Sequence, residues 1–411
     1  MTTQSRGTPL RLVVFAPDTP YPAFRGGRAD VWRRILAFRA LGHEVMLVHL
    51  FESTGPLAPS AADLTAMDRV VSARFGFPMQ RGWRKTLRQL MGLWHTPWHA
   101  ATRVPQGETA LRLREAVMGF APDLMWLDGP WFGPAVEDLA DALDQPFAYR
   151  SHNVEHQYLW GQAAAAVRFR DRWAWRLACF GVQRLERRLM DSACAVFDIS
   201  KDDLAFWQTQ GVKRLHWLPP LPELAVVPFA GEVVPAQVLF MGNLSTPNNV
   251  RGVEFMVEQV WPLVLAVCPA AKLTVVGSNP TAHVAACIAR APAVELRQNV
   301  AEPAAHLLGA QVLVNPVMTG SGVQLKMLDM LMTQARVVTT SQGLRGLPEE
   351  ARSTVVVADG AQAFASAVCE ALSAPAEEAW RQQRQAVQAL FGVDSVAQAL
   401  NGLGLPSRGH A

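Results

Sequence analysis

Residues 312–346 read VLVNPVMTGSGVQLKMLDMLMTQARVVTTSQGLRG, and this stretch decides the fold. Its apolar opening, 312–314, predicts a buried strand, and the Gly-Ser-Gly at 320–322 predicts a tight turn. Residues 323–333 predict a helix, because they are rich in Leu, Met, Gln and Lys and contain no Gly or Pro. A helix that follows such a turn starts with unpaired amides at the positive end of its dipole. We therefore expect a phosphate-binding corner around Ser321.

Two charged residues extend this corner along the predicted helix. Lys326 and Asp329 lie three apart, so on a helix they share a face about one turn from its start. A cation for a diphosphate and a carboxylate for sugar hydroxyls would thus follow one another along a single ligand. The alternative is a plain turn with a serine N-cap and a solvated ion pair. Spacing alone leaves both interpretations open.

Length, charge and cysteine usage narrow the class of protein. The chain has 411 residues, more than the roughly 250 to 300 at which single cores stop growing, so two domains are expected. The formal charge of +3 does not suggest a nucleic-acid binder. The five cysteines have no CxxC spacing, which indicates reduced thiols in a cytoplasmic protein without a zinc site. No apolar run approaches the roughly 20 residues of a transmembrane helix.

The N-terminal half begins as a strand, a glycine-bearing loop, a helix and a second strand. The two strands are predicted at 10–16 and 45–50, the helix at 29–41, and the loop carries Gly26 and Gly27. Open α/β sheets bind ligands at the end of the first strand of such a unit. The loop lacks the G-x-G-x-x-G spacing, which disfavours NAD. A glycine pair that only turns the chain is the alternative.

His152 follows another predicted strand, 147–150. Together with Asn153 and Glu155 it forms a cluster of polar side chains directly after a buried strand, a position suited to chemistry. A lone histidine is more often structural, but these neighbours favour a functional one. Further on, the helical stretch 169–190 is rich in Arg and Trp, and it predicts either a basic, acceptor-facing surface or a plain exposed helix.

Residues 79–105 interleave Arg and Lys with Trp and Leu. Such a segment can lie in a lipid interface, with cations on anionic headgroups and indoles at headgroup depth, so we expect peripheral membrane contact. A helix packed on its own domain with exposed arginines is the alternative. His95 and His99 have i, i+4 spacing but no third ligand, so no metal site is expected.

A proline-dense connector, 217–236, separates two α/β series. We expect an N-terminal domain at 1–216, a second domain at 237–384, and C-terminal helices at 385–411 that cross back to the first. In the second series Gly242, Gly277 and the glycines at 320–322 end successive predicted strands. If those strands are parallel neighbours, the glycine loops share one rim of the sheet.

Several motifs resemble one known family. The series PDTPYPAFRGG, ALGHEV, SHNVEH, FMGNLSTPNNVRGVEF, LTVVGSNP and NPVMTGSGVQLKMLDML is similar, in order, to the GT-B glycosyltransferases of family 4. It is closest to the bacterial branch that builds exopolysaccharide and envelope glycans. The resemblance implies an α/β fold with two Rossmann-like domains, with parallel sheets that face each other across a cleft. It also implies a nucleotide-sugar donor held mainly by the second domain, transfer with retention, and no metal or other cofactor.

Carried over by position, the resemblance assigns roles to residues of this chain. Lys326 would neutralise the diphosphate, Asp329 would replace a glutamate that holds the ribose, and His152 would lie near the transferred sugar. Two positions depart from the family pattern: Ser321 stands where the first glutamate of an E-x7-E pair falls, and Asn243 stands where many members have an arginine. The donor-binding set comprises Gly26, Gly27, Gly242, Asn243, Gly277, Gly320, Ser321, Gly322, Val323 and Asp329.

These observations predict a cytoplasmic glycosyltransferase at the inner face of the membrane. It would move a sugar from a nucleotide diphosphate sugar to a glycan or lipid-linked acceptor in envelope or exopolysaccharide synthesis, with His152 and Lys326 as its catalytic residues. Two alternatives remain open. One is a nucleotide-sugar epimerase or hydrolase on the same fold, and the other is a binding protein with a degenerate cleft, suggested by Ser321 and Asp329.

Overall fold

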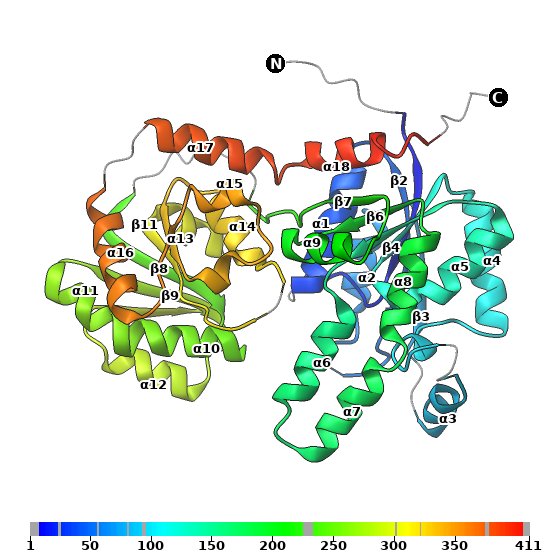
Figure 1. The fold of residues 1–411 in the computed structure, drawn as a ribbon, viewed down its shortest axis with the longest axis horizontal. Coiled ribbons are helices and arrows are strands. Elements are labelled where there is room, and N and C mark those ends of the chain that lie inside the picture. Colours follow the sequence, from blue (N-terminus) through cyan, green and yellow to red (C-terminus); the bar gives the residue numbers. More distant parts are fainter. Residues whose placement is uncertain are drawn as a thin grey trace. The chain divides into compact units, whose positions relative to one another are not determined.

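The computed structural model describes residues 8–23, 26–55, 57–79, 82–92, 96–224, 233–300, 302–320, 322–374 and 378–405. The chain divides into two compact units (Figure 1). The first lies within residues 1–220 and 393–411, and the second lies within 221–392. The expected boundaries at 216, 237 and 385 stay predictions. No helix among the described residues is both long and apolar enough to cross a membrane.

The first unit is built on a parallel sheet of seven strands. The strands lie in the order β3-β2-β1-β4-β5-β6-β7. The order in which the chain adds strands therefore reverses between β1 and β4. The central strands are buried along almost their whole length, which explains their near-continuous apolar sequence. The strands are β1 (Arg11–Ala16), β2 (Glu44–Phe51), β3 (Ala73–Pro78), β4 (Leu124–Asp128), β5 (Phe147–Ser151), β6 (Ala195–Asp198) and β7 (Leu215–Trp217).

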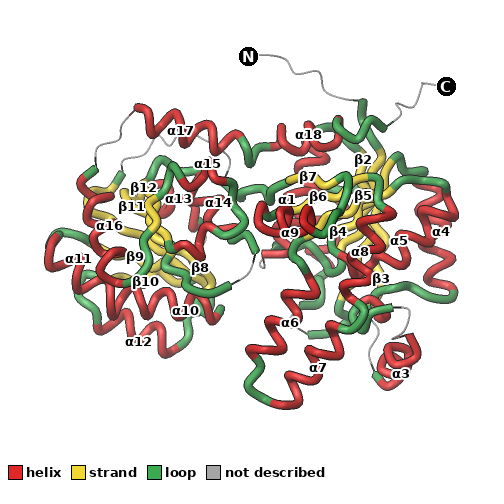
Figure 2. The backbone as a smooth tube through the Cα atoms, in the orientation of Figure 1, coloured by secondary structure: helices red, strands yellow, loops and turns green. Residues whose placement is uncertain are grey.

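Helices flank this sheet, as the tube drawing shows (Figure 2). The predicted helical stretch 169–190 is in fact two helices, because Gly181 takes a left-handed φ of +78° between them. The helices are α1 (Gly26–Ala40), α2 (Ala61–Asp68), α3 (Trp83–Gly92), η1 (Ala100–Thr102), α4 (Glu108–Phe120), η2 (Pro130–Phe132), α5 (Gly133–Leu143), α6 (Glu155–Ala165), α7 (Phe169–Cys179), α8 (Val182–Ser192), α9 (Lys201–Thr209) and α18 (Val393–Asn401).

The second unit repeats the plan with six parallel strands. Their order is β10-β9-β8-β11-β12-β13, and the order in which the chain adds strands reverses between β8 and β11. Neighbouring strands keep their ends level, since Gly242 is the register partner of Gly277. The strands are β8 (Val234–Asn243), β9 (Lys272–Ser278), β10 (Val294–Gln298), β11 (Ala310–Asn315), β12 (Arg336–Thr339) and β13 (Val356–Val357).

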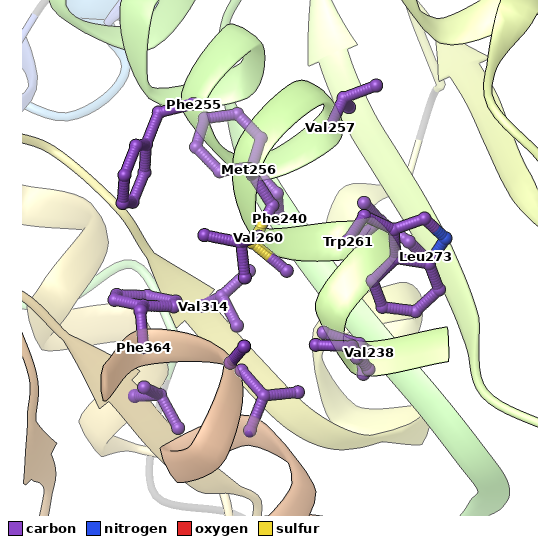
Figure 3. Packing of buried hydrophobic residues seen from close by; sticks show 14 of the residues in the cluster. Val238, Phe240, Phe255, Met256, Val257, Val260, Trp261, Leu273, Val314 and Phe364 are labelled. Atoms are coloured by element: carbon purple, nitrogen blue, oxygen red, sulfur yellow. The ribbon is translucent and has the colours of Figure 1, made fainter. Parts of the chain in front are cut away.

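A dry core fixes the helices of the second unit on its sheet (Figure 3). Phe240 and Val314 from the strands pack with Trp261 and Phe364 from the helices, and all four side chains are fully buried. The helical stretch 247–267 contains a π-helical turn. The helices are α10 (Pro247–Glu254), the π-helix η3 (Phe255–Val260), α11 (Trp261–Val267), α12 (Ala282–Arg290), α13 (Pro303–Gly309), α14 (Leu325–Leu331), η4 (Ser341–Leu344), α15 (Glu349–Arg352), α16 (Ala361–Ser373) and α17 (Glu378–Ala389).

Candidate functional site

The reversal of strand order in the second unit defines where a ligand would bind. In an open parallel sheet the loops diverge at this switch point and leave a crevice beyond the carboxyl ends of the two strands. Here these strands are β8 and β11, and the loops that follow them lead into α10 and α14. Of the glycines expected to share one rim, Gly242 and Gly277 lie at the ends of β8 and β9, and Gly320 and Gly322 follow the neighbouring parallel strand β11.

Lys326 connects the two loops at this switch point. Its Nζ donates to Asn249 Oδ1 at 2.9 Å and lies 4.7 Å from the centre of the Phe240 ring. The residue is only half-buried as a whole, but its ammonium end is shielded by these two groups. Burial lowers the pKa of Lys326 to about 7. No carboxylate among the described residues forms an ion pair with it.

Two of the predicted site glycines are required by packing. A Cβ at Gly277 would lie 2.5 Å from the Gly242 carbonyl oxygen, and a Cβ at Gly242 would lie 2.8 Å from Asn249 Nδ2. Both positions therefore hold the loop close to the strand end, so that Asn249 can reach Lys326. Gly320 and Gly322 serve the backbone itself, with φ values of +142° and +70° that other residues rarely adopt.

Hydrogen bonds between the loops fix the remaining residues of this edge. Asn243, which the family pattern places at a phosphate-binding arginine, instead accepts from the amide and hydroxyl of Ser245 at 3.0 and 2.8 Å. Thr319 donates to Asn248 Oδ1 at 2.7 Å, and Gln342 donates to the Gly320 carbonyl at 2.8 Å. The glycine loop is thus tied to α10 on one side and to η4 on the other.

Helix α14 starts two residues later than the sequence predicted, at Leu325, with Gln324 as its N-cap. Gln324 makes no capping bond with its side chain, which instead accepts from Asn315 Nδ2 at 3.1 Å. Val323 lies in the loop before the helix, and Ser321 lies outside the described residues.

Asp329 is buried on α14 and has a clear structural task. Its Oδ1 accepts from the backbone amides of Glu223 and Leu224, at 2.6 and 3.3 Å. These residues belong to the proline-dense connector, so the carboxylate anchors the start of the second unit to α14. No local pattern predicts this contact, because the two partners are 105 and 106 positions away.

In the first unit, the switch point between β1 and β4 holds a closed group of charges. Arg150, fully buried at the end of β5, binds Asp30 with both terminal nitrogens at 2.8 Å. It also donates to Asp128 Oδ1 at 3.1 Å. His152, which follows β5, places Nε2 2.9 Å from Asp128 Oδ1 and Nδ1 3.5 Å from Asp30 Oδ2.

Sequence analysis singled out only His152 from this group. Asp30 lies in the middle of α1, and 120 positions separate it from Arg150. Burial by itself raises the Asp30 pKa, but the charges of Arg150, His152 and Arg34 outweigh burial, and the pKa ends below its ordinary value. Asp128 had a usable signal, since it stands directly after a buried strand and before a Gly-Pro turn.

A second buried carboxylate pair lies beside this group. Glu186 of α8 accepts from the amides of Glu155 and His156 at 2.7 and 3.2 Å, and from His156 Nδ1 at 2.7 Å. It thereby caps α6 with a charge at the positive end of the helix dipole. Burial, together with the Glu186 charge, raises the pKa of Glu155 to about 7.

The other predicted site residues lie apart from these groups. Gly26 and Gly27 form the exposed first residues of α1, and no atom lies within 4 Å of a Cβ built on Gly27. His99 packs edge-on against Trp131, with ring centres 5.3 Å apart, and His95 lies outside the described residues. The described part of the chain has no cluster of three or more His, Cys, Asp or Glu side chains suited to a metal ion.

Known proteins similar to this chain were found by sequence and by structure. Residues 235–374 match the family described as glycosyl transferases group 1. An uncharacterised 44.6 kDa protein from the cps region of Klebsiella pneumoniae is 24% identical over 367 residues, which cover 86% of this chain and 89% of that protein.

Three solved structures resemble the whole chain. HepE from Anabaena, solved with UDP, has a TM-score of 0.63 at 12% identity, covering 96% of this chain and 98% of HepE. Sucrose-phosphate synthase from Thermosynechococcus elongatus has a TM-score of 0.62 at 17% identity, with coverages of 96% and 98%. TarM from S. aureus, solved with fondaparinux, α-GlcNAc-glycerol and UDP, has a TM-score of 0.64 at 9% identity, with coverages of 96% and 99%. These likenesses confirm the predicted GT-B fold with two Rossmann-like sheets.

Proposed function

We propose that this chain, whose residues 235–374 match the group 1 glycosyl transferases, moves a sugar from a nucleotide diphosphate sugar to a glycan or lipid-linked acceptor. In this proposal the transfer retains the anomeric configuration and serves envelope or exopolysaccharide synthesis. The relative from the cps region of Klebsiella pneumoniae supports that setting. The UDP in the HepE and TarM structures supports a nucleotide diphosphate donor.

One observation carries the proposal: an ammonium without a carboxylate partner among the described residues lies at the switch point of the second unit. Lys326 is held by Asn249 and Phe240, both neutral, and the loop before its helix contains Gly320 and Gly322, which have no side chains to keep an anion away from the backbone. A diphosphate would supply the missing counter-charge. Charge that builds on the leaving diphosphate would strengthen this contact in the transition state, which is how such a group accelerates cleavage of the anomeric C–O bond.

The remaining predicted residues enter as supports of this ligand. Gly242, Asn243 and Gly277 would shape the rim, with Ser321 and Val323 in the loop next to the diphosphate. Asp329 would meet the ribose, and the amides of residues 223 and 224 would hold its carboxylate in place. His152 would orient a sugar hydroxyl, fixed by its contact with Asp128, and Gly26 and Gly27 would approach the donor from the first unit.

Peripheral contact with the inner face of a membrane through residues 79–105 is part of the proposal. Helix α3 supports it, because Trp83, Leu87, Leu90 and Met91 are exposed at i, i+4, i+7 and i+8, on one side of the helix. Gln89 is the buried residue instead, and it donates to the Trp98 carbonyl at 2.8 Å. A helix with its apolar side outward suits a lipid interface.

The test is a panel of nucleotide diphosphate sugars incubated with the purified protein and a lipid extract, with products identified by mass spectrometry. The proposal predicts a glycosylated acceptor and little turnover without lipid. Free sugar released equally with and without lipid would instead support the hydrolase alternative. Calorimetry with UDP and GDP without any sugar adds a second readout, since absence of binding heat for every nucleotide would favour a degenerate binding protein.

A further inference from the structure

Helices α6 and α7 form a hairpin that projects from the sheet of the first unit (Figure 1). Its base is anchored by a small apolar cluster of Leu159, Cys179 and Val182 against Trp131 and Trp175. Beyond this base, the hairpin exposes apolar side chains that a globular domain would normally bury. Val167 at the turn is 95% exposed and Phe169 is 73% exposed, and the others are Tyr158, Trp160, Trp173, Leu177 and Phe180.

The charges on the hairpin are almost all of one sign. Residues 155–184 contain five arginines, whereas their acidic residues are only Glu155, which is buried, and Asp171. Several arginines elsewhere in the unit have carboxylate partners, such as Arg74 with Asp68 and Arg188 with Glu137. Within the described residues, none of the hairpin arginines forms an ion pair: Arg168, Arg170, Arg172, Arg176 and Arg184.

Cations and rings also alternate along this surface. Arg176 lies 5.4 Å from the Trp173 ring centre, and Arg184 lies 5.5 Å from that of Phe180. Next to Arg184 is a hollow of about 360 Å³, whose lining includes Trp160 and Gln183. Indoles at a hydrocarbon boundary with guanidinium groups over anionic headgroups are the pattern of an interfacial membrane anchor.

We propose that the α6–α7 hairpin docks the protein on an anionic lipid bilayer, as an anchor separate from α3. The unpaired arginines define the occupant, because they complement phosphate headgroups, and the exposed rings give the apolar half of the contact. The segment 96–103 joins the two elements, since Pro97 contacts Gly181 at the base of the hairpin and His99 packs on Trp131. The inference does not depend on sugar transfer, because binding to lipid is measured without a donor.

The test is co-sedimentation of the full chain with phosphatidylglycerol vesicles and with phosphatidylcholine vesicles, at low and high ionic strength. We expect binding to phosphatidylglycerol at low salt, with little binding to the neutral lipid. Two double variants address the hairpin, Val167→Ser with Phe169→Ser and Arg168→Gln with Arg170→Gln. The arginine pair should weaken partitioning by about fivefold per charge removed, and the apolar pair should weaken it by about tenfold or more.

Helix α4 offers matched controls in the same unit. It exposes Leu111 and Met118, and also Arg112 and Arg114. The variants Leu111→Ser with Met118→Ser and Arg112→Gln with Arg114→Gln make the same changes and should bind vesicles like wild type. A third variant, Leu87→Ser with Met91→Ser, measures the separate share of α3.

Three results would overturn the anchor. The first is a wild-type protein that does not bind phosphatidylglycerol at low salt. The second is hairpin variants that bind within about twofold of wild type while remaining folded by circular dichroism. The third is light scattering in which wild type is a dimer and the hairpin variants are monomers without change in lipid binding, which would assign the surface to a second copy of the chain.

Discussion

The switch points of the two sheets can be compared, because they share a topology but carry different sets of charged side chains. Between β1 and β4, Arg150 is fully buried and shared by two carboxylates, with His152 against the same oxygens. Between β8 and β11, Lys326 touches only an amide oxygen and an aromatic ring. At the first switch point the charges neutralise each other, whereas at the second no carboxylate of the described residues pairs with the lysine.

This difference predicts that the charges around Arg150 contribute to stability and that Lys326 contributes to ligand binding. A buried ion group is costly to break, since removal of one member leaves the others charged and without a partner. A lone lysine held by neutral groups can be removed without stranding an opposite charge. Substitutions at the first switch point should therefore lower the free energy of unfolding, and substitutions at the second should lower affinity for an anionic ligand.

Arg150→Met tests the first half of the comparison and should have the largest effect. It leaves Asp30 and Asp128 buried and uncompensated, for an expected loss of about 3 to 5 kcal/mol in unfolding free energy. Denaturant unfolding followed by circular dichroism measures it. Arg188→Met is the control, because the Arg188–Glu137 pair is exposed and should be worth less than about 1 kcal/mol. Equal losses in both variants would mean that the buried group has no special role in stability.

Lys326→Ala tests the second half. Loss of one charge-assisted contact to the diphosphate, worth about 1.5 to 3 kcal/mol, should weaken UDP binding by about ten- to hundredfold in calorimetry. Unfolding free energy should not fall by a comparable amount, because the variant strands no carboxylate. Lys272→Ala, at an exposed position of β9, is the matched control and should bind UDP like wild type. Unchanged affinity in Lys326→Ala would remove the lysine from the donor site.

The pH dependence of UDP binding is a second test of the role of Lys326. Because the pKa of Lys326 is lowered to about 7, the free protein loses this charge as pH rises above 7. Bound diphosphate favours the protonated form, so binding should take up a proton, and affinity should fall by about tenfold per pH unit between pH 7 and the pKa of the complex. Calorimetry in buffers of different ionisation enthalpy measures the uptake. Lys326→Ala should show neither effect, and a flat profile in wild type would contradict the assignment.

Local patterns in the sequence predicted the elements around both switch points. Apolar runs marked β1, β2, β5 and β11, and glycines marked the loops at the strand ends, because burial and turn geometry act within a few residues. The glycine at 181 was a missed local signal, and it splits the predicted helical stretch into α7 and α8.

Partnerships between distant residues were not predictable in this way. Asp30 and Arg150 lie 120 positions apart, and Asp329 meets the connector from 106 positions away. Each charge taken alone looks like an ordinary helical or strand-end residue, and only the fold brings the partners together. The state of Lys326 was hidden for the same reason, since its shielding comes from Phe240 and Asn249 on β8 and α10.

Glu155→Gln tests a carboxyl group of the first unit whose charge is not compensated, and it should have the smallest effect. Burial and Glu186 raise the Glu155 pKa to about 7, so the folded state holds a proton there that the unfolded state loses above its ordinary pKa. Stability therefore falls as pH rises from about 4.5 to about 7, and the cost is complete above that window.

The neutral amide removes this cost, so Glu155→Gln should raise the unfolding free energy at pH 8 and change it by almost nothing near pH 4.5. Burial also raises the pKa of Asp198, to about 8, but that residue is present in both proteins, so their difference isolates Glu155. Glu115→Gln, on the exposed side of α4, should have no effect at either pH. A variant that loses stability at pH 8 would mean that the Glu155 carboxylate is compensated after all, as Asp30 and Asp128 are by Arg150.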